Sequence, residues 1–263
     1  MVCLYWGANT DRITIKNSRI RNLFADGVNM TNGSTHNHVV NNDARATGDD
    51  SFALFSAIDA GGADETDNVY ENLTSTLTWR AAGLAVYGGY RNTFRNIHIA
   101  DTLVYSGITV SSLDFGYPMN GFGTEPTTIE NVSLVRTGGH FWGSQTFPGI
   151  WLFSARRSSR HPDQQRRHRR PDVQRHHVPD QLRRRTAPVP HQGHRPHRHL
   201  DHRRKKSGDA FDAKSGFGLW ANELPEAGQG PAVGEVTING LTLNGNHQNV
   251  KNDTSTFKIN INP

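Results

Sequence analysis

The chain of 263 residues has a single cysteine, Cys3, so it can form neither a disulfide framework nor a cysteine-ligated zinc site. No apolar run approaches the roughly 18 residues of a membrane span, and Met1 to Trp6 is too short for the core of a signal peptide. Hydrophobic residues make up only 34% of the sequence, and no segment shows the periodicity and caps of an amphipathic helix. We therefore expect no membrane partner, no export signal in this chain, and an all-β fold.

Acidic residues are scarce in one part of the chain, residues 156–206. This segment holds 15 Arg and 2 Lys against 4 Asp and no Glu, a local charge of +13. The rest of the chain holds the other 12 basic and 20 acidic groups, a charge of −8, although the whole chain carries +5 and has a pI of about 9.6. The basic pI therefore belongs to one segment, and the remainder of the chain is acidic.

The same segment has no Asn, Ile, Phe, Tyr, Trp or Met, but it contains nine of the 14 His and six of the 12 Pro. It is a basic arm for nucleic acid or acidic polymers, a histidine-rich metal tract, or an out-of-frame translation of GC-rich DNA. The third interpretation explains most, because β-rich sequence resumes with Phe211, Phe217 and Trp220. We predict that 156–206 is disordered, that no nucleic acid binds, and that 1–155 and 207–263 are the folded parts.

Short strand-like runs recur along the chain, bounded by Asn, Gly, Asp or Ser. Each alternates apolar with polar or small residues; they are 12–15, 27–30, 52–55, 84–87, 97–99, 108–110, 132–134, 150–153, 236–238 and 241–243. Asp26 and Asp50 are 24 residues apart, and so are Gly83 and Gly107. A strand–turn–strand–turn unit of about two dozen residues is what one coil of a solenoid needs.

This spacing predicts a right-handed parallel β-helix. A β-sandwich is the alternative, but its turns have no reason to keep a 24-residue register. The longer intervals 56–68 and 113–127 are expected to be loops on one face. The sequence starts within a coil, and a solenoid needs a polar cap at each end, so we expect an incomplete β-helix whose upstream coils are missing.

Three acidic residues form the sharpest candidate site. Equivalent positions of adjacent coils stack about 4.8 Å apart, so Asp26 and Asp50 are expected to lie one above the other with Asp49 beside them. Repulsion between carboxylates raises at least one pKa and leaves an acid beside an ionised base, which is the pair that hydrolysis of a glycosidic bond uses. The alternative interpretation is that Asp-Gly and Gly-Asp are ordinary turn dipeptides.

Aromatic residues in the later coils offer faces on which sugars stack, although packing in the core is the alternative for any one of them. We predict contact with substrate for Asn29, Trp79, Tyr87, Tyr90, Trp142 and Trp151. His98 and His140 are the only histidines near predicted strands, and no two histidines there have metal-ligand spacing. We expect no metal and no cofactor; a calcium cluster on the three aspartates is the alternative.

The motifs Phe-Ala-Asp-Gly at 24–27 and Gly-Asp-Asp at 48–50 resemble glycoside hydrolase family 87, the mycodextranases and α-1,3-glucanases. Looser matches are Gly-Leu-Ala-Val-Tyr-Gly-Gly at 83–89, Ser-Gly-Ile at 106–108 and Val-Arg-Thr-Gly at 135–138. The resemblance covers most of residues 1–154.

The resemblance implies a right-handed β-helix, secretion to the extracellular space, and inverting endo-hydrolysis of an α-1,3-glucan or a mixed α-1,3/α-1,4-glucan. It also implies that Asp26 and the Asp49–Asp50 pair are the catalytic carboxylates. One of the pair would protonate the leaving oxygen, and the other, with Asp26, would activate water. We expect a monomer that binds polysaccharide. The alternatives are a non-catalytic glycan-binding β-helix and another β-helical enzyme of the polygalacturonase or dextranase kind.

Overall fold

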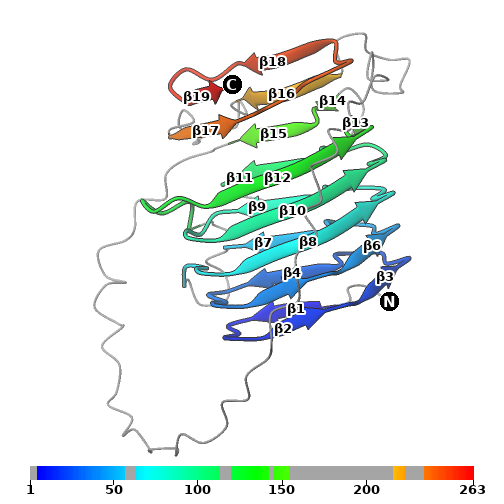
Figure 1. The fold of residues 1–263 in the computed structure, drawn as a ribbon, viewed down its shortest axis with the longest axis vertical. Helices are drawn as coiled ribbons and strands as arrows, with labels where there is room; N and C mark the ends of the chain where they lie inside the picture. The colour runs from blue at the N-terminus through cyan, green and yellow to red at the C-terminus, as the bar shows by residue number, and fades with distance from the viewer. Residues whose placement is uncertain (1–4, 57–62, 113–119, 142–144, 154–215, 223–233) are drawn as a thin grey trace, which may run out of the picture. The chain divides into compact units, whose positions relative to one another are not determined.

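Every regular element in the described part of the chain is a β-strand. The computed structural model describes residues 5–56, 63–112, 120–141, 145–153, 216–222 and 234–263, and these contain no helix (Figure 1). The predicted all-β class is thus confirmed. It also follows that the described part of the chain offers no helix able to span a lipid bilayer.

Two large parallel sheets contain most of the strands. The first sheet has eight strands in the order β1 (Tyr5–Ala8), β4 (Val28–Thr31), β7 (Phe52–Phe55), β9 (Leu84–Tyr87), β11 (Ile108–Ser111), β15 (Ile150–Phe153), β16 (Phe217–Asn222) and β18 (Gln248–Asn252). The second sheet has seven strands, namely β2 (Thr14–Lys16), β3 (Arg19–Arg21), β5 (His38–Val40), β6 (Asp43–Arg45), β8 (Val69–Thr76), β10 (Thr93–Ala100) and β12 (Thr128–Val135).

Two small sheets complete the described structure. Strands β13 (Gly139–Phe141) and β14 (Gln145–Phe147) are antiparallel, and β17 (Glu235–Asn239) pairs in parallel with β19 (Lys258–Asn262). The run 241–243 was predicted as a strand, which is wrong: residues 241–244 pair with no strand, and Leu241 packs against the apolar cluster around Leu219. Alternation of apolar residues does not by itself supply a hydrogen-bonded neighbour.

The chain visits the two large sheets in turn, and we call each such unit a repeat. The predicted 24-residue register is confirmed where β2 pairs with β5, β4 with β7, β8 with β10 and β9 with β11. The register is wider where Phe52 pairs with Leu84 and where Thr93 pairs with Thr128. The extra residues fall in the intervals predicted as loops, 56–68 and 113–127, of which 57–62 and 113–119 lie outside the described residues, and the strands of successive repeats still pair across them.

The turns between strands use the left-handed backbone conformation in aligned columns. Three columns have φ between 49° and 61°: residues 12, 36, 67 and 91; residues 17, 41, 72, 96 and 131; and residues 22, 46, 77, 101 and 136. All five residues of the second column are asparagines, since asparagine tolerates this conformation better than other residues with a side chain. The asparagines of the second column are thus a consequence of the repeated corner.

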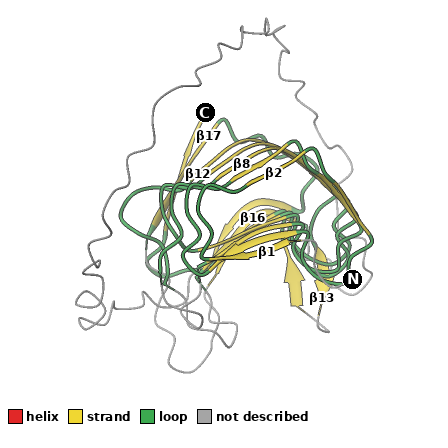
Figure 2. Cartoon of the chain, turned by 90° about the horizontal axis from the view of Figure 1, so that it is seen from below, coloured by secondary structure: helices red, strands yellow, loops and turns green. Residues whose placement is uncertain are grey.

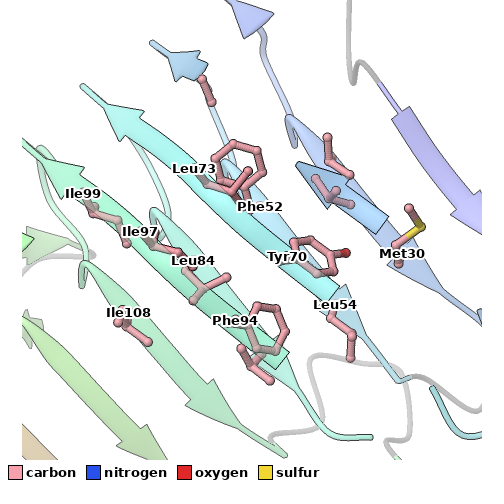
Figure 3. Packing of buried hydrophobic residues seen from close by; sticks show 14 of the residues in the cluster. Met30, Phe52, Leu54, Tyr70, Leu73, Leu84, Phe94, Ile97, Ile99 and Ile108 are labelled. Atoms are coloured by element: carbon pink, nitrogen blue, oxygen red, sulfur yellow. The ribbon is translucent and has the colours of Figure 1, made fainter. Parts of the chain in front are cut away.

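The two large sheets face each other (Figure 2). Large apolar side chains from both sheets pack together between them (Figure 3). Phe52, Leu54 and Leu84 of the first sheet pack with Tyr70 and Phe94 of the second, and all five are fully buried. The Tyr70 and Phe94 rings lie 4.9 Å apart. Burial of each such side chain stabilises the fold by roughly 1.5–3 kcal/mol, so this core holds the two sheets together.

Asparagine side chains also form two hydrogen-bonded rows across the repeats. In the buried amide ladder, Asn37 Nδ2 donates to Asn68 Oδ1 at 2.9 Å, and Asn68 Nδ2 donates to Asn92 Oδ1 at 3.0 Å. The exposed amide ladder runs in the opposite direction, because each side-chain amide donates to the asparagine of the preceding repeat; its members are Asn17, Asn41, Asn72, Asn96 and Asn131. Both rows lock neighbouring repeats in register.

The first sheet continues beyond the Arg-rich segment. Ile150 of β15 pairs with Leu219 of β16, and Trp151 pairs with Trp220, so strands separated by a long interval are neighbours. The segment 156–206, which we predicted to be disordered, lies outside the described residues. The predicted division into parts 1–155, 156–206 and 207–263 stays a prediction.

Candidate active site

Asp26, Asp49 and Asp50 lie together at the turns that lead into the first sheet. Asp26 comes shortly before β4, and the Asp49–Asp50 pair comes just before β7. Backbone bonds place the two turns side by side, because Asp49 N–H donates to Ala25 O and Gly27 N–H donates to Asp50 O at 3.0 Å. Each carboxyl offers an oxygen within 4.8 Å of the others. The sequence prediction that these three side chains cluster agrees with this geometry.

Asp50 is the most buried of the three, at 6% exposure. Its Oδ1 accepts the Ala82 N–H at 2.8 Å, and its Oδ2 accepts the Tyr87 hydroxyl at 3.3 Å. Burial is the main reason why the pKa of Asp50 is well above its usual value, and the charges of Asp49 and Asp26 raise it further. The two hydrogen bonds fix the orientation of the Asp50 carboxyl.

Asp26 lies close to the other two carboxyls. Burial, and then the charge of Asp49, raise the pKa of Asp26 to about 6, while the hydrogen bond from Asn29 opposes this shift. That bond joins Asn29 Nδ2 to Asp26 Oδ2 at 3.1 Å. Asp26 and Asp50 therefore both keep a proton to higher pH than an ordinary aspartate, which is the property that a proton-donating carboxyl needs.

Asp49 is partly exposed and forms an ion pair. Arg80 Nη2 lies 2.6 Å from Asp49 Oδ2, and the Arg80 guanidinium is 5.7 Å from the centre of the Trp79 ring. The positive charge of Arg80 also acts to lower the pKa of Asp26. The basic side chain thus contacts one carboxyl of the cluster and influences a second.

Three of the predicted substrate contacts lie at the cluster. Asn29 and Tyr87 hydrogen-bond the carboxyls of Asp26 and Asp50, and Trp79 is joined to Asp49 through Arg80. Tyr87 is only 7% exposed and packs with Ala53 and Ala85 on the outer face of the first sheet.

The other predicted contacts lie elsewhere. Trp151 is 2% exposed; it packs against Tyr105, Phe147 and Phe153, and its Nε1 donates to Asn222 Oδ1 at 2.6 Å. Tyr90 follows β9, at the opposite end of this strand from the Asp50 turn, and lies under the Arg91 guanidinium. Trp142 lies outside the described residues.

Sequence reasoning missed Arg80 and the exposed Phe24. A strict 24-residue interval does not align Arg80 with Asp49, because the interval between these two residues is longer. Phe24 belongs to the motif that was recognised, but only the structure brings its ring against Trp79, at 6.2 Å between centres. The length of the insertion after Ser56 is the signal that would have aligned Arg80 with Asp49.

Asp26, Asp49 and Asp50 are also the one group of three or more metal-ligating side chains that comes together in the described residues. Carboxylate oxygens suit a hard cation such as Ca²⁺, but Arg80 already supplies a positive charge to Asp49. Of the two histidines considered above, His98 is exposed on β10 and His140 is buried on β13. Our expectation that no metal ion is needed stays a prediction.

Comparison with known families identifies the chain. A family model described as alpha-1,3-glucanase catalytic domain D2 matches residues 1–161. The chain belongs to this family. No curated protein matches the sequence.

Solved structures of GH87 alpha-1,3-glucanase catalytic domains resemble this family member over 98% of its length. Two of them, with tetrasaccharides bound, are 34% and 32% identical, with TM-scores of 0.63 and 0.61. A third, in complex with nigerose, is 32% identical, with a TM-score of 0.60. In each of these three structures a different aspartate is replaced by alanine. Two of the replaced aspartates are adjacent in the sequence of that protein, and the third precedes them. The α-1,3-glucanase family member described here spans 44% of the length of each of those chains.

Proposed function

We propose that this chain carries the catalytic carboxylates of an enzyme that hydrolyses α-1,3-glucosidic bonds, and that Asp26, Asp49 and Asp50 are those carboxylates. The observation that carries the proposal is their convergence within 4.8 Å in a member of the α-1,3-glucanase family. A row of like charges is unfavourable for folding alone, so its presence calls for a chemical role.

The spacing of the three residues supports this assignment. Asp49 and Asp50 are adjacent, as are two of the aspartates replaced in the related structures with bound sugars. In the related chains, the third replaced aspartate precedes the adjacent pair. It does so by the same number of residues by which Asp26 precedes Asp49 here. A turn dipeptide of no chemical importance has no reason to keep both intervals.

The carboxyls divide the two proton transfers of the reaction. One member of the Asp49–Asp50 pair donates a proton to the glycosidic oxygen as the C1–O bond breaks. The other member, with Asp26, accepts a proton from the water whose oxygen forms the new bond to C1. The raised pKa values of Asp26 and Asp50 mean that these carboxyls keep a proton to higher pH than an ordinary aspartate, which suits proton donation, and Arg80 forms an ion pair with Asp49.

The stereochemical outcome is a separate part of the proposal. Inverting enzymes usually hold their two carboxyls roughly 6.5–9.5 Å apart, and retaining enzymes roughly 5–5.5 Å apart. The 4.8 Å within which the three carboxyls meet joins one oxygen of each and does not measure this separation, so inversion rests on the family resemblance. Freshly released sugar from an α-linked glucan is the β-anomer if the enzyme inverts and the α-anomer if it retains, and proton NMR distinguishes them.

The alternation of the chain between two parallel sheets supports a right-handed parallel β-helix as the architecture of the enzyme. We further propose that it acts within the glucan chain, as a monomer outside the cell, and that Asn29, Trp79, Tyr87, Tyr90, Trp142 and Trp151 contribute to substrate binding. The burial of Tyr87 and Trp151 favours contact through their edges, or a supporting role, over stacking on a sugar.

Hydrolysis of insoluble α-1,3-glucan by the full chain tests the proposal. We expect the wild-type chain to release reducing sugar and Asp50→Asn to lower the rate by about 10²–10⁴-fold, because one proton transfer is lost. Asp43→Asn is the matched control, since Asp43 is a partly buried aspartate of β6 that pairs with Arg21 at 2.6 Å, away from the cluster. Equal rates for Asp50→Asn and the control would overturn the assignment, and binding of glucan without hydrolysis would favour a non-catalytic protein.

A further inference from the structure

Three large apolar side chains are exposed on neighbouring repeats beside the carboxylates. Phe24 is 70% exposed, Leu103 57% and Trp79 38%, and we call these three residues the apolar row. Trp79 N–H donates to Thr47 O at 3.0 Å and Leu103 N–H donates to Thr78 O at 2.9 Å, so the backbone stacks the row across the repeats. They are half of the six large apolar residues that are exposed in the described part of the chain. Such a concentration differs from scattered exposed residues, which need no explanation.

Phe24 and Trp79 meet because the residue on the repeat between them is a glycine. A Cβ atom on Gly48 would lie 2.5 Å from Trp79 Cζ2 and 2.3 Å from the carbonyl oxygen of Phe24. With no side chain there, the two rings pack edge to face at 6.2 Å, with an angle of 88° between their planes. Gly48 also leads directly into the Asp49–Asp50 pair, so the same turn shapes the carboxylate cluster and the aromatic pair.

The aromatic pair is continuous with the carboxylates. Phe24 lies on the same turn as Asp26, and the Arg80 guanidinium contacts both the Trp79 ring and Asp49, at 5.7 Å and 2.6 Å. A ligand bound over Trp79 would therefore reach the ion pair at its edge. Apolar faces next to a charged, hydrogen-bonding edge match a sugar ring, whose C–H faces are apolar and whose rim carries hydroxyls.

We propose that Phe24 and Trp79 bind a glucosyl ring of an α-1,3-linked glucan next to the bond that the cluster cleaves. We call the rings of these two residues the platform. This inference rests on the proposed function and adds Phe24 to the residues that touch the substrate. Packing of the sugar removes exposed apolar surface from water, which accounts for large rings that are left uncovered in the free protein.

Titration calorimetry with an α-1,3-linked glucotetraose tests the platform separately from catalysis. The full chain with Asp50→Asn serves as the reference, so that the sugar is not consumed. Adding Phe24→Ala is expected to raise Kd about five-fold, because half of the platform is lost. Adding Phe24→Tyr, which keeps a ring, is expected to leave Kd within about two-fold.

Phe122→Ala is the matched control, because Phe122 is an exposed phenylalanine that pairs with Gly89, beyond the far end of β9 from Asp50. The proposal is overturned if Phe24→Ala and Phe122→Ala give the same Kd, or if the reference does not bind the tetraose. Hydrolysis by the wild-type chain is scored in a parallel assay. Hydrolysis combined with an unchanged Kd in Phe24→Ala rejects the platform alone, whereas absence of hydrolysis rejects the proposed function.

Discussion

The buried amide ladder and the carboxylate cluster are two polar rows built on the same repeat with opposite electrostatics. The ladder of Asn37, Asn68 and Asn92 precedes strands of the second sheet, and the cluster precedes strands of the first. An amide both donates and accepts, so each ladder residue satisfies its neighbours. Ionised carboxylates only accept, so stacking them leaves charge without a donor between adjacent repeats. The buried amide ladder therefore stabilises the fold, whereas the carboxylate cluster does not and is explained by the chemistry proposed for it.

The electrostatic consequences follow the same division. The Asn68 side chain makes four hydrogen bonds: its Oδ1 accepts from the Asn37 backbone and side chain, and its Nδ2 donates to Ser34 O and Asn92 Oδ1, all within 3.0 Å. Asp50 also sits in a buried turn, where burial itself, and then the charges of Asp49 and Asp26, raise its pKa. Burial is therefore tolerated in the amide ladder, because the polar atoms of Asn68 have partners. In the carboxylate cluster, burial instead raises the pKa of the carboxyls.

The largest expected effect on stability comes from placing a carboxyl in the ladder. Asn68→Asp removes both donated bonds of a fully buried side chain and sets oxygens against Asn92 Oδ1 and Ser34 O. We expect the free energy of unfolding to fall by about 3 kcal/mol or more at pH 7, measured by urea titration. The same change at Asn41, in the exposed ladder, is the control and is expected to cost below about 0.5 kcal/mol. Equal losses at the two positions would show that the ladders do not differ in this way.

The converse change places an amide in the cluster and is expected to have a smaller effect of the opposite sign. The folded-state pKa of Asp50 is raised, so between the unfolded value of 3.8 and the folded value the native state binds the extra proton, and stability falls as pH rises. Asp50→Asn removes this dependence. We expect its melting temperature to exceed that of the wild type at pH 7 and to equal it near pH 3, where the Asp50 carboxyl is protonated in both the folded and the unfolded state.

Asp43→Asn sharpens that experiment because the sign is reversed. Arg21 holds the pKa of Asp43 below its usual value, so Asp43 contributes stability above the unfolded pKa that is lost as pH falls. This variant is expected to lower the melting temperature slightly at pH 7. A rise for both variants would mean that removal of any negative charge, rather than the geometry of the cluster, is responsible.

The smallest expected effect concerns the corner conformation of the exposed amide ladder. Asn72 has φ of 54°, and Asn72→Gly keeps this conformation accessible while it removes the hydrogen bond to Asn41. We expect a loss below about 0.5 kcal/mol for glycine and about 1 kcal/mol for Asn72→Ala, by urea titration. Equal losses in the glycine and alanine variants, which both lack the amide, would show that the amide bonds, and not the backbone conformation, are what the corner needs.

Several features were predictable because they depend on neighbours at a fixed interval. The alternating runs 52–55, 84–87 and 150–153 are strands as predicted, and the 24-residue interval gave both the strand pairing and the convergence of Asp26 with Asp50. Hydrogen bonding between parallel strands repeats identically at each level, so one interval in the sequence specifies many contacts. The run 241–243 failed because it has no strand beside it.

The amino-acid sequence by itself determined the all-β class, the repeat and the positions of the three aspartates, since strand period and register are local properties. Only the tertiary structure decided that Arg80 pairs with Asp49, that Phe24 reaches Trp79 over Gly48, and that Trp151 is buried. These contacts depend on how far each insertion shifts the next repeat and on which side chains fill the space beside a turn. The 24-residue interval therefore predicts that the aspartates of the site lie together, but it does not identify the other side chains that surround them.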